Sequence, residues 1–271
     1  MNPIDELFRR LKERGETALI PYVTVGDPDA DTSLEIVLEL ERAGADMVEL
    51  GVPYSDPLAD GPVIQRASAR ALANGLTILD CIRLASRLRE RGSRLPIILF
   101  TYYNPVFRLG PDRFFGLLEE HGASGAIIPD LPFEESGAAR KEAERRGIHL
   151  IPLVAPTSRE RVRRIAAQAS GFIYCVSSLG VTGMRSTFYE GVGDFLASVR
   201  QATDLPLAIG FGISNRQQVE TFSRMVDGVV VGSAIVREIE EALPLLQDPA
   251  KRQEGLSHIR RFVASLKGQD A

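Results

Sequence analysis

Two carboxylates in one short stretch of the sequence have the types and spacing for acid–base chemistry. Glu49 lies inside the apolar run Met47-Val48-Glu49-Leu50, where an ionised group is costly to bury. Asp60 follows eleven positions later (60 − 49 = 11), in a segment rich in Pro, Gly and Ser. If both carboxyl groups face one site, one can hold a proton while the other stays ionised, as general acid–base catalysis requires.

Each carboxylate also has a purely structural interpretation. Glu49 could pair with a Lys or Arg in the interior of the protein. Asp60-Gly61-Pro62 could simply begin a helix, with Asp at the cap position and Pro in the first turn. The sequence leaves these interpretations open, because neither of them depends on catalysis.

Three segments of small residues in the second half of the chain indicate a phosphate site. They are Gly180-Val181-Thr182-Gly183, Gly210-Phe211-Gly212-Ile213-Ser214 and Gly232-Ser233-Ala234. Glycine lets backbone N–H groups approach an anion closely. The segments themselves contain no Lys or Arg, although Arg185 lies nearby, so we expect backbone amides to hold a single phosphate group. They do not form the dinucleotide-binding fingerprint, because Asn215 stands where that pattern requires Gly or Ala.

Eight short apolar runs predict the strands that must position these residues. They are Ala18–Val25, Asp46–Val52, Pro96–Tyr102, Gly125–Pro129, His149–Val154, Phe172–Val176, Leu207–Phe211 and Gly228–Gly232. The runs are nearly continuous rather than alternating, which is typical of parallel strands that helices cover. Helical patterns separate the runs, and several end in Gly just before the next strand, as in His121-Gly122-Ala123.

Eight strands that alternate with helices predict an α/β fold, a (β/α)8 TIM barrel, in a single domain over residues 1–271. An additional N-terminal helix is expected over Pro3–Arg14, and extra helices over Val63–Asn74, Thr77–Arg91 and Pro249–Leu266. A doubly wound sheet is the alternative. In a TIM barrel the site lies at the C-terminal ends of the strands. Glu49, Asp60 and the three glycine segments all lie at or after such ends.

The composition excludes several classes of protein. The chain has 271 residues and a formal net charge of −4, so nucleic acid is not the expected partner. No apolar run reaches the length of a membrane span, and the first residues lack the apolar region of a signal peptide. Cys81 and Cys175 are expected to be reduced core thiols rather than a disulfide, and His121, His149 and His258 lack the spacing of metal ligands. We therefore expect a cytoplasmic protein without a bound metal.

The residues around Glu49 resemble the signature of the tryptophan synthase alpha subunit family. The resemblance covers the whole of Val48–Gly61 (VELGVPYSDPLADG), which is a highly specific motif. Pro21–Pro28, Gly180–Gly183 and Gly210–Ser214 are similar to further landmarks of that family, in the same order. The glycine segments are less specific, because many phosphate-binding barrels contain them. In all, the resemblance runs from about Pro3 to the C-terminus.

This resemblance implies a carbon–carbon lyase of L-tryptophan biosynthesis that cleaves indole-3-glycerol phosphate to indole and glyceraldehyde 3-phosphate. It implies no cofactor in this chain. Indole would pass to a beta subunit that uses pyridoxal phosphate, within an αββα heterotetramer. By match to the motifs, the catalytic residues would be Glu49 and Asp60. The substrate-binding residues would be Tyr22 and Phe100, which line the indole pocket, and Gly183, Gly212, Gly232 and Ser233, which supply amides to the phosphate. Tyr174 and Thr182 would also bind the substrate.

Two other functions remain as alternatives at this point. One is a different phosphate-sugar barrel enzyme, such as an isomerase, and the complete motif around Glu49 argues against it. The other is a barrel that only binds and activates a partner. A scaffold of that kind has no need of both Glu49 and Asp60 at the barrel mouth, so the lyase is the favoured prediction.

A partner is expected to bind over the loops after the second, third and fourth strands. These loops are Pro53–Asp60, Asn104–Arg108 and Pro129–Phe133. Phe107, Leu131 and Phe133 are apolar residues in segments that otherwise resemble exposed turns, and such residues are typical of an interface. The alternative is that these side chains fold back onto the barrel.

Overall fold

The apolar runs form nine parallel strands in the computed structural model, which describes residues 1–156, 158–176, 191–210 and 212–269. The strands are β1 (Ala18–Thr24), β2 (Val48–Gly51), β3 (Ile97–Phe100), β4 (Gly125–Ile127), β5 (His149–Leu150), β6 (Leu153–Val154), β7 (Ile173–Val176), β8 (Leu207–Gly210) and β9 (Gly228–Val231). Their order in the sheet is β5-β4-β3-β2-β1-β9-β8-β7-β6. All the pairings are parallel, with Tyr22 opposite Glu49 and Glu49 opposite Ile98 in the register.

The sheet closes on itself through the segment that was predicted as the fifth strand. β5 and β6 are the two halves of that strand, separated by Ile151 and Pro152. The Ile151 N–H donates to the Ala126 carbonyl at 2.9 Å, and the Tyr174 N–H donates to the Pro152 carbonyl at 3.0 Å. The segment therefore bonds to β4 on one side and to β7 on the other. Pro152 has no N–H, which interrupts the regular ladder. This closure confirms the TIM barrel, and the doubly wound alternative is wrong.

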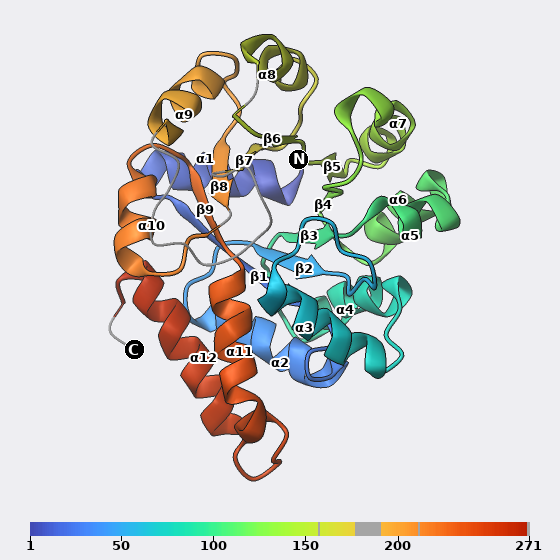
Figure 1. The fold of residues 1–271 in the computed structure, drawn as a ribbon, viewed down its shortest axis with the longest axis vertical. Coiled ribbons are helices and arrows are strands. Elements are labelled where there is room, and N and C mark those ends of the chain that lie inside the picture. The colour runs from blue at the N-terminus through green and yellow to red at the C-terminus, as the bar shows by residue number, and fades with distance from the viewer. Residues whose placement is uncertain (157, 177–190, 211, 270–271) are drawn as a thin grey trace.

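Helices surround the strands on the outside of the barrel (Figure 1). They are α1 (Pro3–Arg14), α2 (Ala30–Arg42), α3 (Pro62–Ala73), α4 (Ile78–Glu90), α5 (Tyr103–Leu109), α6 (Pro111–Glu120), α7 (Gly137–Arg145), α8 (Arg159–Ala166), α9 (Val192–Arg200), α10 (Arg216–Ser223), α11 (Ser233–Leu246) and α12 (Arg252–Lys267), with a 3-10 turn η1 at Phe133–Glu135. The additional N-terminal helix and the extra helices α3, α4 and α12 lie where the sequence predicts them.

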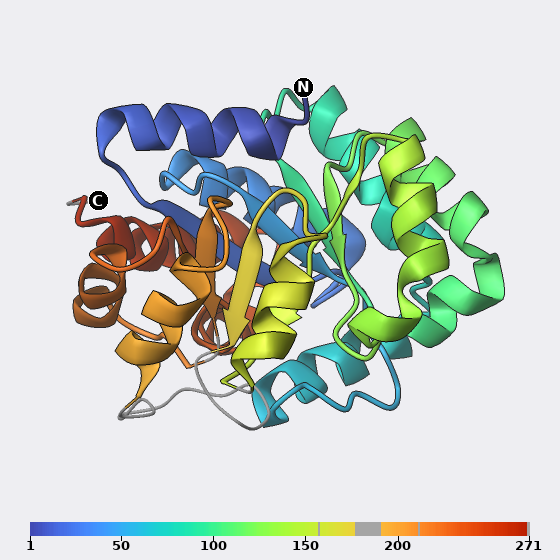
Figure 2. The same ribbon diagram turned by 90° about the horizontal axis from the view of Figure 1, so that it is seen from above.

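The N-terminal helix α1 lies across one end of the barrel (Figure 2). Its side chains Ile4, Leu7 and Phe8 are buried, and the Phe8 ring lies 5.5 Å from the ring of Phe172, just before β7. α1 therefore fills the end of the barrel at which the strands begin. The opposite end, where the strands finish, is left for a functional site.

The packing of the strands decides which side chains enter the barrel. Val48 and Leu50 of β2 belong to the buried layer between strands and helices. Glu49 lies between them, and because successive side chains of a strand point to opposite faces, it points into the barrel. Tyr22, Phe100 and Tyr174 lie in the second buried cluster, inside the barrel. The three aromatic side chains and Glu49 thus share one interior.

Two expectations about the partner-facing segments need correction. Asn104–Arg108 is not a turn but part of helix α5, in which Pro105 falls in the first turn and so breaks no helical hydrogen bond. Leu131 and Phe133 are only partly exposed and pack against the core, and the Arg140 guanidinium stacks on the Phe133 ring at 4.6 Å. These two side chains fold back onto the barrel, as in the alternative interpretation. Phe107 does not, since 68% of it is exposed.

Other expectations about the chain agree with the structure. Cys81 and Cys175 are buried free thiols. Among the described residues, no helix combines the length and the apolar character that crossing a membrane requires.

Candidate active site

One pocket at the C-terminal ends of the strands brings most of the predicted site residues together. Its lining consists of Tyr22, Glu49, Asp60, Ile64, Phe100, Tyr174, Gly212, Val230, Gly232 and Ser233. Ile64 and Val230 are the two that sequence reasoning missed, because an apolar residue at a helical or strand position has no distinguishing signal. Thr182 and Gly183, which were also predicted, lie outside the described residues. The free volume is about 30 Å³, enough for one or two water molecules and too small for an indole ring.

Glu49 is almost completely buried in this pocket, with 1% of it exposed. Its Oε1 atom has no hydrogen-bond partner, and no ion pair within the described part of the chain involves it. Among the described residues, no contact supports Glu49 as half of an interior ion pair. Burial raises the pKa of the Glu49 carboxyl group from its ordinary value to about 8. Because burial penalises the charged form, the neutral acid is the stable form at neutral pH.

Asp60 is held in the pocket by a tyrosine from another strand end. The Tyr102 hydroxyl donates to Asp60 Oδ2 at 3.0 Å, and the Ala59 N–H donates to the same tyrosine oxygen at 3.0 Å. Burial raises the pKa of Asp60 to about 6, although the hydrogen bond from Tyr102 opposes this shift. The cap of α3 is Gly61, with no side-chain cap bond. Asp60 is thus not the helix cap, and it is largely ionised at neutral pH while Glu49 is not.

Tyr102 is a site-forming residue that sequence reasoning missed. It lies just after β3, 42 residues from Asp60, and its ring stacks on that of Tyr54 with 4.9 Å between centroids. The available signal was its position at a predicted strand end, the same signal that drew attention to Glu49. A position at a strand end does not show which of the many side chains at the barrel mouth Tyr102 contacts.

Three aromatic side chains form the apolar wall of the pocket. The rings of Tyr22 and Phe100 meet edge to face, with centroids 5.6 Å apart. The hydroxyl of Tyr22 lies so close to Gly51 that a Cβ atom there would be 2.1 Å from it. The Tyr174 hydroxyl lies against Gly210 in the same way, at 2.0 Å from such an atom. Glycine is needed at both strand positions because each tyrosine fills the space of a side chain.

The helix α11 directs its N-terminus at the same pocket. Gly232 is its N-cap, Ser233 is its first residue, and no side-chain cap bond is made at this end within the described part of the chain. The first N–H groups and the positive end of the helix dipole therefore face the pocket. Gly212 lies beside them with a φ of 100°, a backbone conformation that favours glycine. None of the described lining residues is Lys or Arg, so an anion would be bound mainly by backbone amides.

The pocket therefore combines a protonated carboxyl group, an ionised carboxylate, an aromatic wall and an anion-binding helix end. Glu49 can donate a proton to a substrate, and Asp60 can accept a hydrogen bond from a group that becomes positive. The helix end at Ser233 suits a phosphate. An aromatic substrate that carries a phosphate has both of the features that this arrangement recognises.

Comparison with known proteins gives a consistent result. The model of a family described as tryptophan synthase alpha chain matches residues 8–265. The tryptophan synthase alpha chain of Geobacillus kaustophilus is 54% identical over 247 residues, which are 91% of this chain and 92% of that protein. That of Bacillus licheniformis is 48% identical over 262 residues, 97% of this chain and 98% of that protein. The crystal structure of tryptophan synthase subunit alpha from Legionella pneumophila matches with a TM-score of 0.86 and 34% identity, covering 99% of this chain and 98% of that one.

Proposed function

The chain belongs to the tryptophan synthase alpha chain family, whose members are lyases that cleave indole-3-glycerol phosphate, and we propose that Glu49 and Asp60 carry out this cleavage. The observation that supports these roles is the pairing of a buried carboxyl group of raised pKa with a carboxylate held by Tyr102 in one pocket. The two alternatives, an isomerase and a non-catalytic partner barrel, have no comparable support. The direct test is release of indole from indole-3-glycerol phosphate by the purified chain.

The reaction needs a proton at carbon 3 of the indole before its bond to the glycerol chain breaks. Without that proton the bond would have to expel a poor carbanion. Glu49 donates the proton, and the resulting cationic indolenine accepts the bonding electrons and leaves as neutral indole. The adjacent hydroxyl of the glycerol chain becomes the aldehyde, and its proton returns to the Glu49 carboxylate. Asp60 accepts a hydrogen bond from the indole N–H and stabilises the positive charge as it forms.

The two raised pKa values predict a bell-shaped pH profile of kcat/KM. Glu49 has to be protonated in the free enzyme, so activity falls as the pH rises through about 8. Asp60 has to be ionised, so activity falls as the pH drops through about 6. Steady-state indole release between about pH 5 and pH 9 measures both limbs. A profile that stays flat over this range would contradict the two assigned protonation states.

The phosphate of the substrate is held by backbone amides of Gly212, Gly232 and Ser233, together with that of Gly183, and Thr182 is a further substrate-binding residue; these last two lie outside the described residues. The N-terminus of α11, which lines the pocket at Gly232 and Ser233, supports this assignment. A cationic side chain is not required, because the N–H groups and the helix dipole already favour an anion.

We expect Gly232→Ala to raise KM about ten- to a hundredfold, because the added methyl group takes up space beside the helix end and pushes the phosphate away from one N–H group, and loss of one hydrogen bond to a charged group costs about 1.5–3 kcal/mol. The protein itself should tolerate the change, since a Cβ atom there would only touch the Tyr22 side chain at 3.6 Å. Gly137→Ala is the control, because a Cβ atom at Gly137, in α7, has no neighbour within 4 Å. An unchanged KM in Gly232→Ala would place the phosphate elsewhere.

An alpha chain implies a beta-subunit partner, and we place its docking surface at Leu58 and Phe107. Leu58 is 77% exposed and Phe107 is 68% exposed. The two segments that carry them are connected, because the Asn104 side chain donates to the Tyr54 hydroxyl at 3.4 Å. The sequence suggested Leu131 and Phe133 as interface residues, but these two pack against the core. We therefore assign Leu58 to the docking surface in their place. A partner at this surface would cover the segment that contains Asp60.

Phe107→Ser should weaken beta-subunit binding about thirtyfold or more, the range of a central aromatic contact worth at least about 2 kcal/mol. The slow cleavage by the isolated chain should not change, because Phe107 lies outside the pocket. Met225→Ser is the control: Met225 is 38% exposed and precedes β9, at the opposite end of the barrel. Titration of labelled beta subunit measures the affinity. Equal affinities for both variants and the parent would move the interface away from Phe107.

Further parts of the proposal follow from the family. Cleavage needs no cofactor in this chain, and pyridoxal phosphate belongs to the beta subunit of an αββα heterotetramer. The protein acts in the cytoplasm on indole-3-glycerol phosphate, with no nucleic acid or membrane partner. The whole chain, residues 1–271, folds as one barrel domain.

A further inference from the structure

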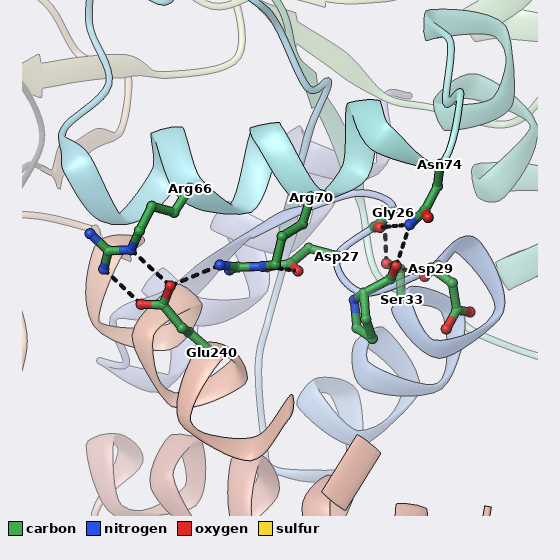
Figure 3. A network of polar contacts seen from close by, with 9 residues as sticks. Gly26, Asp27, Asp29, Ser33, Arg66, Arg70, Asn74 and Glu240 are labelled. Atoms are coloured by element: carbon green, nitrogen blue, oxygen red, sulfur yellow. Dashed lines mark hydrogen bonds and ion pairs between the residues drawn. The ribbon is translucent and has the colours of Figure 1, made fainter. Parts of the chain in front are cut away.

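A network of four charged side chains connects α3, α11 and the segment after β1, and it takes no part in the proposed chemistry (Figure 3). Arg70 of α3 donates to both carboxylate oxygens of Asp27, at 2.8 Å each. Arg70 also donates to Glu240 of α11 at 2.8 Å. Arg66, one turn earlier in α3, donates to both oxygens of Glu240 at 2.8 and 2.7 Å. Two guanidinium groups thus balance two carboxylates.

This network connects three elements that each supply a residue to the pocket. Asp27 follows β1, which carries Tyr22. α3 begins just after Asp60. α11, which holds Glu240, begins at Ser233. The network therefore connects the elements that carry three parts of the pocket: the aromatic wall at Tyr22, the carboxylate of Asp60 and the helix end at Ser233.

The Asp27–Arg70–Glu240 part of the network is too enclosed to be an ordinary surface ion pair, whereas the Arg66 side chain is 53% exposed. Asp27 is 2% exposed, while the side chains of Arg70 and Glu240 are 27% and 23% exposed. Bidentate pairs between Arg and a carboxylate also fix the relative orientation of both groups. Buried ion pairs often add less stability than apolar residues of the same size, so stability alone does not explain this arrangement. A role in fixing the orientation of α3 relative to α11 does explain the ion pairs between these helices.

We propose that Arg70 and Glu240 are positioning residues that set the separation between Asp60 and the N-terminus of α11. This inference rests on the proposed function, in which Asp60 binds the indole end of the substrate and α11 binds the phosphate end. One rigid molecule has to reach both groups at once. The ion pairs between α3 and α11 keep the two groups at the spacing that the substrate requires, and a shift of about 1 Å in such a site can lower the rate about a hundredfold.

Glu240→Ala removes the hydrogen bonds between α3 and α11 and leaves the rest of the network in place. Asp27 keeps both of its bonds to Arg70, so no carboxylate is left buried without a partner. Glu241→Ala is the matched control, since it removes the same side chain at the next position of α11. Among the described residues Glu241 pairs along its own helix with Arg237, and it is 54% exposed. Glu240→Gln is the conservative variant, because its amide oxygen can still accept from Arg70.

The experiment compares a ligand that contacts both ends of the pocket with one that contacts a single end. Indolepropanol phosphate joins an indole ring to a phosphate through three carbons, and inorganic phosphate occupies only the helix end. Glu240→Ala should weaken the binding of indolepropanol phosphate about tenfold or more, with a similar fall in kcat/KM. It should change the affinity for inorganic phosphate less than about twofold. Glu240→Gln should recover part of the loss, and Glu241→Ala should resemble the parent.

Three outcomes would overturn the inference. Unchanged affinity for indolepropanol phosphate in Glu240→Ala would show that the spacing does not depend on the network. Equal weakening of both ligands would show damage to the helix end rather than a change of spacing. If Glu240→Ala does not fold, Glu240→Leu takes its place, because Leu keeps much of the side-chain volume but cannot accept from Arg70. A Glu240→Leu protein with the parent's ratio of the two affinities and the parent's kcat/KM would then overturn the inference. In each of these cases a parent that releases indole leaves the proposed function intact, whereas a parent that releases none would contradict both.

Discussion

Glu49→Gln should lose nearly all cleavage activity, at least about a hundredfold, which is the contribution expected of a general acid–base group. Gln fills the same space in the pocket but can neither donate a carboxyl proton to carbon 3 of the indole nor take one back. No other described carboxyl group in the pocket can replace Glu49, because Asp60 is already bound to Tyr102. Indole release at saturating substrate and neutral pH measures the effect.

The same substitution should leave the protein folded, and more stable than the parent in alkaline solution. The pKa of Glu49 is about 8 in the folded chain, against an ordinary value of 4.5. Between these two values the folded chain binds more protons than the unfolded chain, so the free energy of unfolding of the parent falls as the pH rises. Gln stays neutral and escapes this loss, which amounts to a few kcal/mol at about 1.36 kcal/mol for each pKa unit.

Thermal unfolding of the parent and Glu49→Gln near pH 5 and near pH 9 tests the stability difference. A stable but inactive Glu49→Gln protein separates a catalytic role from a structural one. If the variant kept a tenth or more of the parent activity, Glu49 would not be the proton donor. If its stability followed pH as the parent's does, Glu49 would not be the buried neutral acid that the pocket indicates.

Asp60→Asn should lower kcat about a hundredfold or more while substrate still binds. The amide oxygen can accept a hydrogen bond from the indole N–H, but it lacks the charge that stabilises the cationic intermediate, and removal of one such stabilising group typically costs about 10²–10³ in rate. Asp56→Asn is the matched control, because Asp56 belongs to the same segment but is exposed and bonds only to Ser55 in the described contacts.

Single-turnover rates and substrate affinity for these variants separate binding from chemistry. Asp60→Ala extends the series, since it also removes the acceptor for the Tyr102 hydroxyl. Turnover at the parent's rate in both Asp60→Asn and Asp60→Ala would leave Asp60 with no catalytic role. A loss of affinity without a loss of kcat would instead make it a binding residue only.

The sequence by itself determined the elements and their order in this protein. The continuous apolar runs and the Gly residues that end helices are local signals, since a strand or a helix end depends on residues only a few positions apart. The N-terminal helix Pro3–Arg14 was therefore predicted with its observed bounds. Local rules also located Glu49 and the small-residue segment Gly232-Ser233-Ala234, because in a barrel the ends of strands are the site.

Local signals were ambiguous where one segment could serve two purposes. Pro105 suggests a turn, yet Pro is equally compatible with the first turn of a helix, and Asn104–Arg108 is helical. The apolar residues Phe107 and Phe133 look alike in sequence. Only the fold shows that Phe133 lies under Arg140 while Phe107 is exposed, because burial depends on what other segments cover.

The chemistry of the pocket was decided by the tertiary structure alone. All four residues of β2 are buried, so no alternation in the sequence shows that Glu49 points into the barrel. The contact between Asp60 and Tyr102 joins residues 42 positions apart, and the pair Arg70–Glu240 joins residues 170 apart. A carboxyl group in a sequence has its ordinary pKa, whereas Glu49 acquires a pKa of about 8 from the neighbours that exclude water once the barrel closes. Desolvation and pairing are sums over all surrounding segments, and the closed barrel is what brings those segments together.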